Sequence, residues 1–161
     1  MRPVAVALAA LALAPAAAAA LPENGVVAPG TSLGGVRLGA TKQAVRARWG
    51  ASFGICRGCS ATTWYFNYVA FQPQGAGVVF RDGRADALFT LWQPPGWHTT
   101  EGVKVGDAVA SVTTAYGALD RRDCNGYYAL ILRRPGAVTE FYVVDEHVWG
   151  FGVSRVPQPC R

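Results

Sequence analysis

Four cysteines, Cys56, Cys59, Cys124 and Cys160, are the residues whose spacing most restricts the chemistry of this chain. The first two have the C-x-x-C spacing of a redox pair, and four thiols together could hold a zinc ion. A redox motif, however, precedes a helix, whereas residues 62–71, TTWYFNYVAF, are typical of a strand. The second half also lacks a C-x-x-C for zinc. We expect no metal or other cofactor, and of the three possible disulfide pairings we favour Cys56 with Cys59 and Cys124 with Cys160.

The two histidines are the residues that could act as a general base near neutral pH. His98 follows Trp97 in a stretch rich in proline and glycine, and His147 falls at a predicted hairpin turn. No serine has the G-x-S-x-G frame of a nucleophile elbow, and neighbouring carboxylates fall in predicted turns, where they serve turn geometry. We therefore expect no catalytic residues, and we keep a small secreted hydrolase that uses His98 or His147 as an alternative.

Aromatic residues crowd one predicted strand and the stretch that follows the first half. Alternation along residues 62–71 places the even-numbered aromatic residues on one face, which we expect in the core. The odd-numbered residues, which mix aromatic and polar side chains, are expected to face outward. An outward aromatic strip can bind a protein partner or a sugar ring. The candidate binding residues are Thr63, Tyr65, Asn67, Trp92 and Trp97.

The net charge is weakly positive, with 15 Lys and Arg against 10 Asp and Glu. The pairs Arg121-Arg122 and Arg133-Arg134 lie beside turn signals, where charge is normally solvated. Nucleic-acid binding would require a denser basic stripe with interleaved aromatic residues. We expect no nucleic-acid partner.

Residues 1–20 have the composition of an export signal. Arg2 precedes an apolar run at 4–14, VAVALAALALA, and Ala18 and Ala20 supply the small residues of a cleavage site. The run is shorter than the roughly 20 residues that a membrane span needs. We expect cleavage near Ala20, a secreted or cell-envelope protein that begins at Leu21, and no lipid anchor, since no cysteine lies near the cleavage point.

An internal repeat of 67 residues must position these side chains. GVRLGATKQAVRARWG, at 35–50, returns as GVKVGDAVASVTTAYG, at 102–117. In each copy a capping residue, Thr41 or Asp107, precedes apolar residues at helical spacing, and a glycine, Gly50 or Gly117, closes the segment. The repeat predicts two short helices.

Three strands are predicted after each helix, at 62–71, 78–81 and 84–92 and again at 127–132, 139–144 and 148–153. Hairpin turns are predicted at Asp82-Gly83 and Asp145-Glu146. We predict an α+β fold, a tandem repeat of a helix followed by three antiparallel strands. One such half would bury little by itself, so we expect the halves to share one antiparallel sheet or core with both helices on one face.

The predicted boundaries are a signal peptide at 1–20, an N-terminal extension at 21–34, the first repeat at 35–92, a Pro/Gly linker at 93–101 and the second repeat at 102–161. Gln93-Pro94-Pro95-Gly96 cannot belong to a helix or a central strand. We expect one cooperative domain.

The pattern of Leu38-Gly39, a helix that ends at Trp49-Gly50, and then VFRDGR at 79–84 resembles the repeat unit of the β-lactamase-inhibitor-protein-like and outer-membrane-assembly lipoprotein superfamily. The resemblance extends over nearly the whole mature chain and lies in short glycine and aliphatic positions. It implies a tandem helix-on-sheet fold that is used for binding without catalysis.

We therefore expect a secreted, non-catalytic binding or interaction module of the cell envelope or the medium. Its partner is expected to be a protein, bound through a sheet face. The alternatives are a glycan-binding module that uses exposed aromatic residues and the small hydrolase described above.

Overall fold

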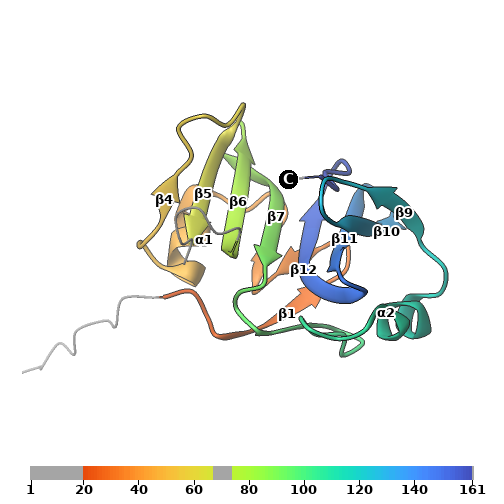
Figure 1. The fold of residues 1–161 in the computed structure, drawn as a ribbon. Coiled ribbons are helices and arrows are strands. Elements are labelled where there is room, and N and C mark those ends of the chain that lie inside the picture. Colours follow the sequence, from red (N-terminus) through yellow and green to blue (C-terminus); the bar gives the residue numbers. More distant parts are fainter. Residues whose placement is uncertain (1–19, 67–73, 161) are drawn as a thin grey trace, which may run out of the picture.

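The structure is a computed structural model that describes residues 20–66 and 74–160. Asn67, the end of the predicted strand 62–71 and all of the predicted signal peptide except Ala20 lie outside the described residues. Two helices of eight residues, α1 (Lys42–Trp49) and α2 (Val109–Tyr116), accompany two sheets in the described part (Figure 1).

Eight strands form the large sheet. They are β4 (Gly54–Ile55), β5 (Thr62–Phe66), β6 (Gly75–Arg81), β7 (Arg84–Leu91), β9 (Asp120–Asp123), β10 (Tyr128–Arg134), β11 (Ala137–Val144) and β12 (His147–Ser154). Their order in space is β4-β5-β6-β7-β12-β11-β10-β9, and every neighbouring pair is antiparallel. Figure 1 shows β4 to β7 in one half of the sheet and β12 to β9 in the other half. The two halves meet where β7 pairs with β12.

Four short strands form the second sheet. They are β1 (Asn24–Ala28), β2 (Ser32–Leu33), β3 (Val36–Arg37) and β8 (Gly96–Thr99). The order is β3-β2-β1-β8, and β1 pairs with β8 in parallel, with Asn24 opposite Gly96. Segments about 70 residues apart in sequence are therefore joined by backbone hydrogen bonds.

The predicted α+β repeat of a helix and three antiparallel strands is wrong. The described chain is mostly β, and each half gives four strands to the large sheet. In the second sheet, β1 and β2 come from the predicted extension, β3 from the start of the predicted first repeat and β8 from the predicted linker. The missed strands lack the alternation that identifies a strand, because β4 has two residues and β9 is DRRD, exposed throughout. The strands of the second sheet are short and lie among glycine and proline, which indicate turns in sequence.

Both predicted hairpin turns are confirmed. Asp82 and Gly83 join β6 to β7 with φ angles of 50° and 74°, and Asp145 and Glu146 join β11 to β12 with φ angles of 47° and 59°. Two consecutive residues with positive φ are what a two-residue hairpin needs to match the twist of its strands.

The two predicted helix starts differ in outcome. Thr41 is the N-cap of α1, and its side chain accepts a hydrogen bond from the Ala44 N–H at 3.2 Å, as predicted. The prediction of Asp107 as N-cap of α2 is wrong, since Ala108 occupies that position without a side-chain bond. The Asp107 carboxylate instead accepts from the Lys104 N–H at 2.8 Å and stabilises the turn before the helix.

One main core lies between the large sheet, both helices and the second sheet. Trp49 of α1 is its central side chain, 1% exposed, with the indole Nε1 donating to the Gly34 carbonyl at 3.0 Å. Its ring contacts Phe66 of the large sheet at 5.3 Å and Trp97 of the second sheet at 5.5 Å between centroids. Among the described residues, no helix is long and apolar enough to cross a membrane.

Replacing Trp49 by alanine is expected to lower the free energy of unfolding by about 3–5 kcal/mol, because the cavity left would be lined by both sheets. Calorimetry of the purified protein measures the loss, and the single core predicts one transition. Val26→Ala, at a side chain that is 45% exposed on β1, should change stability by less than about 0.5 kcal/mol. Two resolved transitions would show that the halves have separate cores.

Tyr116, at the end of α2, joins the helix to the segment that precedes it. Its ring packs against Phe141 at 5.2 Å, and its hydroxyl donates to the Glu101 carboxylate, which also accepts from the Thr100 hydroxyl. Burial, followed by the bond to Glu101, raises the pKa of Tyr116 to about 12. The Thr100 and Tyr116 hydroxyls lower the pKa of Glu101.

A raised tyrosine pKa means that the folded state favours the protonated phenol. This stabilisation is fully present below the ordinary pKa of 10 and is lost as the pH rises towards about 12. We expect the urea midpoint of the wild type to fall over this interval, and to fall less for Tyr116→Phe, which has no proton to lose. If the urea midpoints of the wild type and of Tyr116→Phe fall equally over this pH interval, the Tyr116 hydroxyl does not contribute to the pH dependence of stability.

Candidate functional site

The face of the large sheet opposite the main core carries a second cluster of apolar and aromatic side chains. We call this surface the second face. Its residues are Tyr65, Val79, Phe89, Leu91, Tyr127, Ala129, Tyr142 and Trp149. Phe89, Ala129 and Tyr142 are buried and the other five are partly buried.

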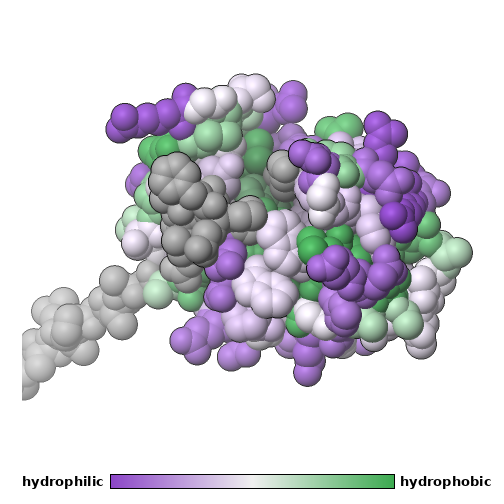
Figure 2. All heavy atoms as spheres, in the orientation of Figure 1, coloured by the Kyte–Doolittle hydropathy of each residue, from purple (hydrophilic) through white to green (hydrophobic). Residues whose placement is uncertain are grey.

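Ring contacts join aromatic residues of the second face that lie on different strands or just before a strand. Tyr65 meets Phe89 edge-on at 5.8 Å, and Tyr127 meets both Tyr142 and Trp149 at 6.2 Å. Such pairs add roughly 0.5–1.5 kcal/mol each beyond simple burial. The rings therefore have defined positions. In the view of Figure 2, weakly hydrophilic and hydrophobic residues gather near the middle of the molecule, over β7 and β12, with hydrophilic residues around them.

Two glycines let the rings of the second face lie close to the backbone. A Cβ atom at Gly77 would overlap the ring of Phe89, and one at Gly152 would overlap the hydroxyl of Tyr142 and the carboxylate of Glu140. Glycine inside a strand weakens the strand but permits a close approach of this kind. The packing of Phe89 therefore requires glycine at position 77, and the packing of Tyr142 requires glycine at position 152.

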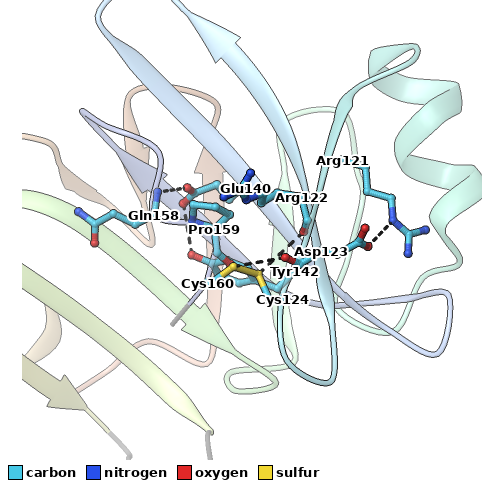
Figure 3. The surroundings of a disulfide bond; sticks show 9 residues. All are labelled: Arg121, Arg122, Asp123, Cys124, Glu140, Tyr142, Gln158, Pro159 and Cys160. Atoms are coloured by element: carbon cyan, nitrogen blue, oxygen red, sulfur yellow. Dashed lines mark hydrogen bonds and ion pairs between the residues drawn. A yellow bond between two sulfur atoms is a disulfide. The ribbon is translucent and has the colours of Figure 1, made fainter.

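The C-terminal tail is fastened beside this face (Figure 3). Cys160 forms a disulfide with Cys124, and the backbone N–H of Gln158 donates to the carboxylate of Glu140. Glu140 is fully buried and also accepts from the Tyr142 hydroxyl at 3.3 Å. A buried carboxylate needs such donors, so the tail satisfies a polar group that the strand places inside the protein.

A cavity of about 440 Å³ lies between the second face and the tail. Tyr65, Phe89 and Leu91 from the sheet line it, together with Gln158 from the tail. Cys59 and Cys160, one from each disulfide, also lie on its wall. Both crosslinks therefore fix the border of the same cavity.

A smaller cavity of about 380 Å³ lies at the end of β7, beside the β11–β12 turn. Its lining includes Gln74, Trp92, Asp145, His147 and Trp149. Trp149 belongs to both the second face and this cavity, whereas Tyr65 and Phe89 line only the larger cavity.

The predicted binding residues have different positions in the structure. Tyr65 lies on the face opposite Trp64 and Phe66, as predicted, but is partly buried. Thr63 lies on that face too, yet it is only 4% exposed and its hydroxyl donates to the Ala61 carbonyl at 3.1 Å. Trp92 is 44% exposed.

Trp97 was predicted as a binding residue and is instead fully buried in the main core. Its Nε1 donates to the Pro22 carbonyl at 2.8 Å, and its ring covers Gly34. The parallel pairing of β8 with β1 places the side chain there. Asn67, the remaining candidate, lies outside the described residues.

Each histidine ring contacts a backbone carbonyl close to it in sequence. The Nδ1 of His98 lies 3.2 Å from the Gly96 oxygen, and that of His147 lies 2.7 Å from the Asp145 oxygen. The predicted disulfides, Cys56 with Cys59 and Cys124 with Cys160, are confirmed and use all four thiols. Within residues 20–66 and 74–160, no three His, Cys, Asp or Glu side chains come together as a metal site.

No known protein family matches the chain, and no characterised protein matches it by sequence. Two solved structures are similar in fold. A DUF4309 family protein (YjgB) from Bacillus subtilis subsp. subtilis str. 168 has a TM-score of 0.54 and 13% identity, over 78% of this chain and 87% of that one. An extracellular protein containing a SCP domain, from Bacillus anthracis str. Ames, has a TM-score of 0.51 and 10% identity, over 73% of this chain and 43% of that one. The chain thus spans less than half of the second protein, and both likenesses are of fold alone.

Removing the tail crosslink with Cys124→Ser and Cys160→Ser is expected to lower the free energy of unfolding by about 4 kcal/mol, since this disulfide joins residues with a sequence separation of 36. The matched pair Cys56→Ser and Cys59→Ser opens a loop with a separation of three and should cost about 2 kcal/mol. Urea unfolding of both double variants provides the comparison. An equal or larger loss for the shorter loop would contradict the chain-entropy reasoning.

Proposed function

We propose that this chain is an extracellular, non-catalytic binding module that receives a protein partner on the second face of its large sheet. The observation that carries the proposal is the partly buried aromatic cluster of that face, over which a cavity of about 440 Å³ stays open beside the tail. Apolar and aromatic side chains that remain partly exposed in one contiguous area are typical of interaction sites.

Three observations support export of the chain. Residues 1–20 have the composition of an export signal, and two disulfides use all four cysteines. Disulfides persist in oxidising compartments and are rare in the cytosol. One of the structures with a similar fold is described as an extracellular protein.

The side chains of the second face favour a protein as the partner. Tyr65, Tyr127 and Trp149 are of the types enriched at the centres of protein interfaces, where they supply large contact areas at small cost in conformational entropy. Val79 and Leu91 supply apolar area between them. The arrangement has few charges at its centre, which is also typical of such centres.

Rigidity of the site supports the same function. The strands beneath the rings are paired on both sides, and the two disulfides fix the wall of the cavity formed by Cys59 and Cys160. A partner would therefore bind a preformed surface, which reduces the entropy lost on association.

The test places one charge in the cavity and the same charge elsewhere on the protein. Val79→Asp adds a carboxylate to the partly buried wall, and Val26→Asp adds it to an exposed position of β1 in the other sheet. Immobilised wild type and Val26→Asp should retain the same partner from the envelope fraction and medium of the source organism. Val79→Asp should bind that partner at least about tenfold more weakly, because a buried unpaired charge must be desolvated.

Both variants must first show near-native unfolding midpoints. Equal retention by Val79→Asp and the wild type would exclude the second face as the binding site. Equal weakening by the two variants would mean that the added charge, and not its position, causes the loss.

A further inference from the structure

The smaller cavity is bordered by an exposed tryptophan that is held in a strained backbone conformation. Trp92 has a φ angle of 61° and its side chain is 44% exposed. A bulky residue in the left-handed region is a steric outlier that glycine or asparagine would occupy at lower cost. Since 44% of the surface of this residue stays exposed to solvent, burial alone gives little reason for tryptophan here. Strain of this kind is concentrated at ligand sites.

Hydrogen bonds of the backbone fix the residues that line the cavity. The Trp92 N–H donates to the Trp149 carbonyl at 2.6 Å, across the β7–β12 pair. The β11–β12 turn, which also lines the cavity, is tied to the start of α2, because the Val109 N–H donates to the Glu146 carbonyl at 3.0 Å and the Val148 N–H to the Asp107 carbonyl at 2.8 Å. Backbone hydrogen bonds therefore hold both Trp92 and the β11–β12 turn in place.

Polar residues line the same cavity as the two indole rings. Asp145 supplies a carboxylate and Gln74 an amide, which can donate and accept. The Nδ1–H of His147 donates to the Asp145 carbonyl at 2.7 Å, so in the neutral ring Nε2 is the acceptor. The lining thus combines two indole side chains with a few hydrogen-bonding residues, as a small-molecule site does.

We propose that this cavity is a carbohydrate site, in which Trp92 and Trp149 bind the C–H face of a sugar ring in a neutral glycan. A sugar has an apolar ring face and a rim of hydroxyls. One sugar residue can therefore contact both the indole rings and the polar side chains of the cavity. Its hydroxyls donate to the Asp145 carboxylate and to Nε2 of His147, and accept from the Gln74 amide. The carboxylate of Asp145 disfavours an anionic glycan.

This site shares Trp149 with the second face, but the rest of its lining differs from that of the larger cavity. The larger cavity is lined by Tyr65, Val79 and Phe89, none of which borders the smaller one. A glycan of the cell surface would meet the same exported chain. The two proposals can therefore fail separately.

The experiment follows the indole N–H signals of the ¹⁵N-labelled full chain by NMR during titration with cellohexaose, maltohexaose or hexa-N-acetylchitohexaose, which are all neutral, up to about 10 mM. Signals of Trp92 and Trp149, assigned with Trp→Phe variants, should shift with at least one of the three. Trp49 and Trp97 are fully buried in the main core and serve as internal controls that should not move.

Two variants test the chemistry of the site. Trp92→Ala should weaken binding at least about tenfold, whereas Ile55→Ala, which shortens a side chain that is 61% exposed on β4, should leave it unchanged. Asp145→Asn keeps a residue that tolerates positive φ but loses the charged acceptor, so binding should weaken several-fold with the fold retained.

Three outcomes would overturn the proposal. One is the absence of a shift of Trp92 and Trp149 with all three oligosaccharides, and another is unchanged binding by Trp92→Ala. The third is a loss of the captured protein partner by Trp92→Ala as well as by Val79→Asp, with no effect of any oligosaccharide. That result would assign Trp92 to the protein-binding face.

Discussion

The pairing of β7 with β12 is the interaction on which the rest of the structure depends. Five residue pairs, from Gly150 with Leu91 to Ser154 with Ala87, join the two groups of four strands into one sheet. A Cβ atom at Gly150 would overlap the Thr90 carbonyl, so the close approach of the two strands needs a glycine at this point. Once the sheet is continuous, it has two extended faces, and each must be protected from water.

The two faces are protected by different means. α1, α2 and the second sheet cover the first face. Trp49 of α1 contacts Phe66 of the large sheet and Trp97 of the second sheet, and Tyr116 of α2 packs against Phe141 of the large sheet. Among the described residues, the second face is covered by its own aromatic rings, lying over glycines, and by the tail that Cys160 fastens. Flat rings and one short tail fill space less completely than a layer of helices, so cavities remain on this side. The capacity to bind therefore follows from how the sheet is covered.

Local features of the chain were predictable from sequence. Thr41 with its helix, both hairpin turns and both disulfides depend on residues near one another or on the number of cysteines, and each is confirmed. Features that depend on distant pairing were not predictable. DRRD at β9 has no apolar alternation and is a strand only because Tyr128 and its neighbours in β10 accept it as a partner. β1 and β8 are likewise strands because they pair across about 70 residues.

The same contrast explains why the two tryptophans beside the proline-rich segment, Trp92 and Trp97, have opposite roles. In sequence they are equivalent, five residues apart and each near turn-forming residues. Trp97 lies on β8, whose parallel pairing with β1 carries the ring over Gly34 and into the core. Trp92 follows the last residue of β7, where positive φ turns its ring towards the β11–β12 turn instead. Hydrophobicity cannot separate such positions, because both rings are equally apolar and only the register of remote strands decides which one is covered. Aromatic residues at the ends of central strands are consequently the places where this fold leaves rings available to a ligand.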